Sequence, residues 1–78
     1  MNKVEQRTEE LKEALPHVSE AELKNPQTLR KMAWEYDREG EFYETIEPSI
    51  EEANKKYNIA SRLELLATAI ENSLDSAL

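Results

Sequence analysis

The fold of this chain is decided by residues 41–57, which read EFYETIEPSIEEANKKY. Apolar side chains recur there at intervals of three or four positions, which places them on one face of an α-helix. These side chains are Phe42, Ile46, Ile50, Ala53 and Tyr57. Because Glu and Lys fill the other faces, we predict a central amphipathic helix over 41–57, with its apolar face covered by neighbouring helices.

Pro48 lies inside this central helix and leaves several alternatives open. It can stand in the first turn of a helix that begins near Thr45 or Glu47, or it can kink a longer helix. Ser49 and Glu52 also have the spacing of a capping box, which would start the helix only at that point. We favour a helix that begins near Glu41 and is distorted at Pro48.

Before the central helix, the sequence predicts a first helix over about 2–15 with a narrow apolar seam. Pro16 ends it, since proline disfavours helical geometry at the preceding residue and has no amide hydrogen to donate. A short helical turn over 20–24 follows. Ser19 and Glu22 open this turn with the spacing of a capping box.

The pair Asn25 and Pro26 predicts the start of the next helix, over 26–39. Asn is a favoured N-cap, and proline is tolerated at the first helical position because its missing donor is not needed there. Gly40 is the only Gly in the chain and follows the last periodic residue. We therefore expect it to end this helix as a left-handed cap.

The last helix is predicted over 60–77, opened by Ser61 and Glu64 and separated from the central helix by a cap at Asn58. It has the most regular apolar stripe in the chain, formed by Ile59, Leu63, Leu66, Ile70, Leu74 and Ala77. So broad an apolar face indicates a helix that is contacted from more than one side.

Together these elements predict a single all-α domain over 1–78, a small bundle of three to four helices. A chain of 78 residues buries only about 60% of the surface that it exposes when unfolded, so its core is modest. Homodimerisation could complete such a bundle by supplying further apolar contacts.

Several residue types that carry catalytic or metal chemistry are scarce or absent. The chain has no Cys, one Gly and one His, so it cannot build a disulfide, a thiolate metal site, a glycine-rich phosphate loop or a His pair. We therefore predict no enzyme activity, no catalytic residue, no cofactor and no metal.

The net charge is −7, from seventeen acidic and ten basic residues. Such a chain is repelled by phosphate backbones and anionic lipids, so direct binding to nucleic acid or membrane is disfavoured. No apolar run reaches the roughly 20 residues of a membrane span, and the N-terminus lacks the apolar core of a signal peptide. The absence of Cys fits a reducing compartment, and we expect a cytoplasmic protein.

Acidic and aromatic residues concentrate in the middle of the chain, where Arg38 is the one basic residue between positions 35 and 52. We expect the aromatic residues to form a shared core between the helices over 26–39 and 41–57. Trp34 lies off the apolar stripe, and we expect another segment to cover it; if exposed, it becomes a principal partner contact. The candidate partner-binding residues are Trp34, Asp37, Glu41, Tyr43, Glu44 and Glu47.

Two functions fit these features. The first is a small acidic protein–protein interaction module of regulator, chaperone or accessory type, homodimeric or not. Its partner would bind the acidic and aromatic middle or surplus apolar surface on the last helix. The second is an inhibitor whose spaced carboxylates imitate a phosphate backbone and occupy a protein that binds DNA or RNA.

Overall fold

The computed structural model describes the backbone of residues 3–77 and the side chains of residues 3–73. Its elements are α1 (Lys3–Ala14), α2 (Glu20–Leu23), α3 (Pro26–Thr45) and α4 (Ile50–Ala77). No strand occurs in the described range, so the predicted small all-α bundle is confirmed. The start predicted for the first helix, at residue 2, lies outside the described residues.

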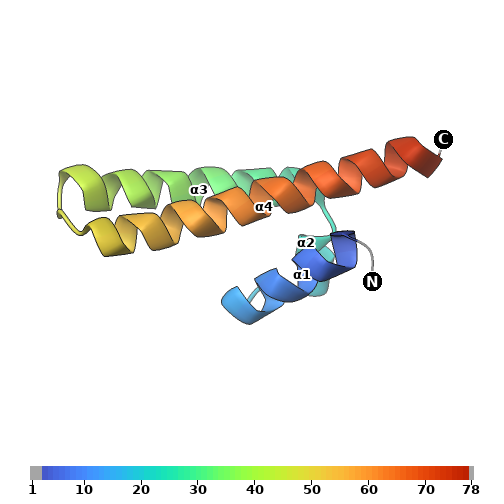
Figure 1. The fold of residues 1–78 in the computed structure, drawn as a ribbon, viewed down its shortest axis with the longest axis horizontal. Coiled ribbons are helices and arrows are strands. Elements are labelled where there is room, and N and C mark those ends of the chain that lie inside the picture. Colours follow the sequence, from blue (N-terminus) through green and yellow to red (C-terminus); the bar gives the residue numbers. More distant parts are fainter. Residues whose placement is uncertain (1–2, 78) are drawn as a thin grey trace.

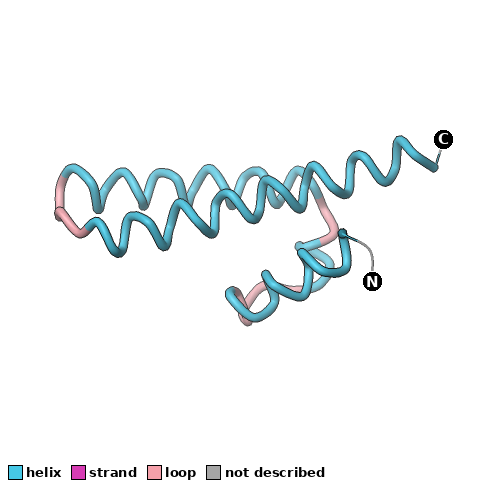
Figure 2. The backbone as a smooth tube through the Cα atoms, viewed as in Figure 1, coloured by secondary structure: helices cyan, strands magenta, loops and turns pink. Residues whose placement is uncertain are grey.

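The two long helices, α3 and α4, run antiparallel and side by side as a helical hairpin (Figure 1). The hairpin turns through residues 46–49, which form the loop at one end of the molecule in Figure 2. We call residues 42–53 the hairpin tip. The helices α1 and α2 lie against the part of the hairpin remote from this tip, and the molecule measures 46 × 21 × 17 Å.

Local capping explains the predicted helix starts that the structure confirms. The Ser19 hydroxyl accepts a hydrogen bond from the Glu22 amide, and the Glu22 carboxylate accepts one from the Ser19 amide, which completes the capping box of α2. The Asn25 side chain accepts hydrogen bonds from the amides of Gln27 and Thr28 and so begins α3. Both signals depend on neighbours within three residues.

The cap predicted at Gly40 is wrong, because α3 continues through it to Thr45. No residue among those described has a positive φ, so Gly40 is helical and does not make a left-handed turn. It is buried, and a Cβ placed on it would lie 2.6 Å from Cε1 of Tyr57. The missing side chain therefore admits the Tyr57 ring from α4 against the backbone of α3.

The central helix predicted over 41–57 is also wrong, since the chain leaves helical geometry between Thr45 and Ile50. Pro48 cannot donate to the helical ladder, and its ring disfavours helical geometry at the preceding residue. The Ser49 amide donates to the carbonyl of Tyr43 at 2.8 Å, which closes the end of α3. The Ser49 hydroxyl accepts from the Glu52 amide at 3.4 Å, so the alternative in which the helix starts only at Ser49 is the one observed.

The break predicted between residues 57 and 60 is absent, because α4 is one helix of 28 residues from Ile50 to Ala77. Asn58 and Ser61 therefore lie inside it and do not cap it. No Pro or Gly occurs between Ile50 and Ala77, so nothing in the backbone chemistry stops the helix there.

Leucine and alanine dominate the core, and the predicted aromatic core is wrong. Trp34 is 58% exposed and Phe42 is 40% exposed. Alanines on the facing sides of α3 and α4 permit close approach of the two helices and leave no room for an indole between them. The buried cluster is Leu11, Leu15, Leu23, Leu29, Ala33, Ala60, Leu63, Leu66 and Ala67.

The contact between Gly40 and Tyr57 yields a test of the hairpin. Alanine is favoured over glycine in a helix interior by about 1 kcal/mol, yet we predict that Gly40→Ala destabilises this chain, because its Cβ would clash with the Tyr57 ring. In a Tyr57→Ala background, the same change should stabilise the chain by about 0.5–1 kcal/mol. Urea unfolding of the four variants measures this coupling, and an equal stabilising effect in both backgrounds would contradict the contact.

Candidate functional site

A row of large side chains runs along the solvent-facing side of α3, away from the core. Its members are Trp34, Arg38 and Phe42 on successive turns of α3, and Ile46, the C-cap residue that follows the helix; each is four residues from the next. Trp34, Phe42 and Ile46 are 58%, 40% and 73% exposed. The Arg38 guanidinium carbon lies 4.8 Å from the centre of the Trp34 ring, a cation–π contact that fills the gap in the row. We call these four residues the outer row.

The apolar surface continues across the turn of the hairpin. Ile50, the first residue of α4, is 77% exposed and follows Ile46 at the other end of the connection. Among the side chains of residues 3–73, four of the five strongly exposed large apolar ones therefore lie in the outer row or at the tip, the fifth being Leu65 on α4. Single exposed apolar residues are common on protein surfaces, but several at helical spacing make this row a candidate contact surface.

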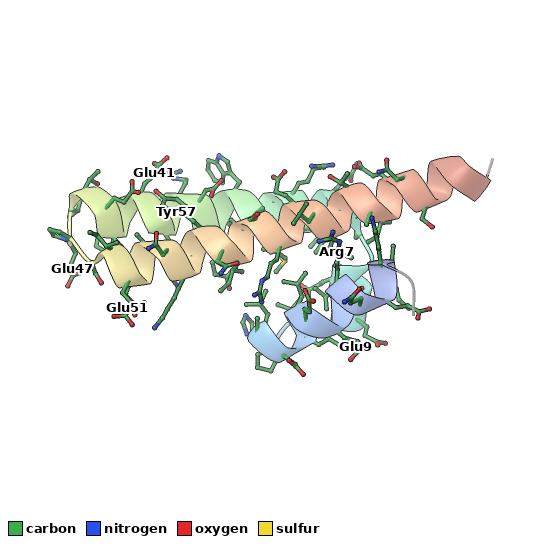
Figure 3. All side chains as sticks on the ribbon, in the orientation of Figure 1. Arg7, Glu9, Glu41, Glu47, Glu51 and Tyr57 are labelled. Atoms are coloured by element: carbon green, nitrogen blue, oxygen red, sulfur yellow. The ribbon has the colours of Figure 1, made fainter. Side chains whose placement is uncertain are left out.

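A stripe of carboxylates lies beside the outer row on the same helix. Asp37, Glu41 and Glu44 are spaced four and three apart, and all three act electrostatically on Tyr57 of α4. Figure 3 shows Glu41 and Tyr57 near each other on the two arms of the hairpin. Desolvation raises the pKa of the Tyr57 phenol above its ordinary value, and the hydrogen bond with Glu44 and the neighbouring carboxylate charges raise it further.

Most carboxylates near the tip have no cationic partner within the molecule. Of those between positions 35 and 52, Glu39 lies 3.4 Å from Lys56, and Glu52 lies 3.4 Å from Lys55. Within the described part of the chain, no ion pair reaches the remaining six, which are Glu35, Asp37, Glu41, Glu44, Glu47 and Glu51. Figure 3 shows Glu47 and Glu51 at the turn, where they extend away from the helices.

At the opposite end of the molecule, several ion pairs join separate elements. Arg30 of α3 binds Glu64 at 3.3 Å and also Glu71, both on α4. Lys12 of α1 binds Glu9 and Glu20, and the Glu20 pairing joins α1 to α2. The unpaired negative charge is therefore concentrated along the distal half of the hairpin.

The six candidate residues from the sequence all lie on α3 or in the turn that follows it. Trp34 is exposed, so the predicted cover by another segment is wrong. The exposed carboxylates Asp37, Glu41 and Glu44 share the stripe beside Tyr57, whereas Glu47 belongs to the turn. Tyr43 is half-buried and lies apart from them, edge-on to Phe42 with ring centroids 5.4 Å apart.

Sequence reasoning missed Phe42, Ile46 and Ile50 as surface residues, because their spacing suggested a buried stripe. The signal that could have exposed the error is Pro48 followed by the Ser49 capping pattern, which separates Ile46 and Ile50 into different helices. Once the chain turns there, this apolar spacing no longer describes one face of one helix.

Open grooves also occur where α1 meets the hairpin. One, of about 370 Å³, lies between α1 and α4 and is lined by Lys3 and Arg7 together with Leu65. Another, of about 380 Å³, lies beside the Lys12–Glu20 ion pair. Among the residues with described positions, no three His, Cys, Asp or Glu side chains are grouped so as to hold a metal ion.

Across residues 3–77, no helix is both long enough and apolar enough to cross a lipid bilayer. No protein-family model, curated protein or solved structure matches this chain. The interpretation of the outer row therefore depends on its own residues.

The raised pKa of Tyr57 predicts how stability responds to alkaline pH. Up to about pH 9 the phenol is protonated in both states, so it has no effect on the free energy of unfolding. As the pH rises further, the unfolded phenol ionises first, and the native state loses stability. We predict that Tyr57→Phe reduces this loss between about pH 9 and 11, whereas the control Tyr43→Phe retains it. Equal slopes for both variants in urea unfolding would contradict the assignment.

Proposed function

We propose that this chain is a small acidic protein–protein interaction module of regulator, chaperone or accessory type, which binds a protein partner through the outer row. The single observation that supports this function is the exposure of Trp34 and Phe42 along the outer side of α3, continued by Ile46 at its C-cap. We further propose that it acts in the cytoplasm, which its lack of Cys favours, and that it contacts neither membrane nor nucleic acid directly.

Leaving the apolar side chains of this row in water costs free energy that a partner can recover by covering them. Covering a large apolar side chain contributes about 1.5–3 kcal/mol relative to full exposure, and these residues are already partly covered. Even part of that contribution at the three apolar positions of the row is enough to add substantially to a micromolar complex, which needs about 8 kcal/mol. Trp34 and Arg38 are also residue types that dominate binding energy in interfaces.

Imitation of a nucleic-acid backbone is the second candidate, favoured by the unpaired carboxylates Asp37, Glu41 and Glu44 on one stripe. We rank it second because a phosphate mimic has no use for the exposed Ile46 and Ile50. The two functions differ in their response to salt. Binding of a mimic should weaken steeply as ionic strength rises, whereas an interface centred on the outer row should keep most of its affinity.

Site-specific photo-crosslinking in the native host tests the module. A photoreactive residue at Ile46 should yield a discrete adduct with one protein, and the same residue at exposed Ser61 of α4 should not. A third position is Leu65, whose side chain is 46% exposed and which probes the apolar surface of the last helix. An adduct from Leu65 alone would move the interface to α4, and the absence of any adduct at Ile46 and Leu65 would contradict the proposed function.

A further inference from the structure

We infer that the occupant of the outer row is a basic amphipathic helix of another protein. In this arrangement, its apolar side lies along Trp34, Phe42, Ile46 and Ile50, and its Lys and Arg side chains reach the carboxylates on either side. This inference depends on the proposed function and specifies the chemistry of the partner.

The charge distribution selects a basic partner. Between positions 35 and 52 there are eight acidic residues and one basic residue, Arg38, which is already engaged with Trp34. Two of the eight carboxylates are neutralised by Lys55 and Lys56. The other six flank the apolar row without an ion pair in the described structure, so a partner that brings cations forms interactions that the free chain lacks.

The same charge argues against a second copy of this chain bound tip to tip. Two such surfaces would bring unpaired carboxylates together, and like charges across an interface oppose association. The cations Lys3 and Arg7 of another copy line the groove between α1 and α4, and Figure 3 shows Arg7 in the angle between those helices. These cations lie in the part of the molecule remote from the tip, so they do not neutralise the carboxylates of the tip when two copies meet tip to tip.

The geometry of the row favours a helix as the partner segment. Trp34 to Ile46 is twelve residues, which is about 18 Å along a helix axis, or about three turns of a partner helix beside it. The backbone groups of α3 are used within the helix, so an extended partner finds no strand edge to pair with. Side chains spaced four apart instead form a ridge of the kind that packs between the ridges of another helix.

Titration of the isotope-labelled chain with synthetic peptides tests this inference. The first peptide is a Lys/Leu amphipathic helix of about 18 residues. The second has the same composition with Leu scattered around the helix, and the third replaces Lys by Glu. We expect the first peptide to shift the amide resonances of residues 34–50, the second to bind about tenfold more weakly, and the third not to bind.

Matched charge reversals then test the role of the carboxylates. The double variant Glu41→Lys with Glu47→Lys should lower the affinity for the first peptide by about tenfold, and Ile46→Ser with Ile50→Ser should lower it comparably. The control is Glu10→Lys with Glu13→Lys on α1, which makes the same change in net charge far from the tip and should leave affinity unchanged. Thermal unfolding followed by circular dichroism establishes that each variant is folded.

Four results would overturn the inference. The first two are that the α1 control weakens binding of the first peptide as much as the changes at the tip do, and that the scattered peptide binds as tightly as the first. The third is that the first peptide shifts only amide resonances of α1. The fourth is that the chain self-associates in light scattering without peptide, with the amide resonances of residues 34–50 changing as it does so. The proposed function fails separately. If crosslinking at Ile46 captures a protein while no Lys/Leu peptide binds, the module stands and the partner chemistry is wrong.

Discussion

The turn at Pro48 is the constraint on which the rest of the structure depends. Because proline cannot continue the helical ladder, α3 ends at Thr45 and α4 begins at Ile50, and the chain folds back along itself. The antiparallel arrangement buries the leucines and alanines of both helices and brings Tyr57 onto Gly40. Because α4 covers only one side of α3, the other side faces solvent, and the outer row lies there.

The hairpin divides into two halves with different physical roles. In the half remote from the tip, α1 and α2 add Leu11, Leu15 and Leu23 to the core, and ion pairs join separate elements. The distal half has no such cover, and small buried residues such as Gly40 and Ala53 hold its two arms close together. Apolar side chains and unpaired carboxylates are left at its surface. The main core and its ion pairs are therefore separated from this exposed surface along a molecule 46 Å long.

The starts of α2 and α3 could be read from the sequence, because each depends on a local capping interaction, whereas the capping pattern at Ser61 and Glu64 lies inside α4 and starts no helix. Ser19 with Glu22, and Asn25 with Pro26, act within a single turn of helix, so no knowledge of the fold is needed. Pro16 correctly predicted the end of α1, but the end of α3 could not be read in the same way. Gly40 has the composition of a cap, but its role is to admit the Tyr57 ring, a contact across seventeen positions that only the hairpin creates.

The candidate surface was predictable in part. Trp34, Asp37, Glu41 and Glu44 do lie together on α3, because helical spacing alone places them on neighbouring faces. Periodicity cannot decide which of two apolar faces is buried when a helix has both, and so Phe42 and Ile46 were assigned to the core. The position of the turn, and with it the exposure of Ile50, decides that question.

Backbone chemical shifts of the labelled chain in solution test the central claim most directly, because they report helix residue by residue. The hairpin predicts helical shifts through Gly40 and from Ile50 through Ser61, with a break confined to residues 46–49. Helical shifts across 46–49, with breaks at Gly40 and near Asn58, would restore a single central helix and contradict both the hairpin and its outer row.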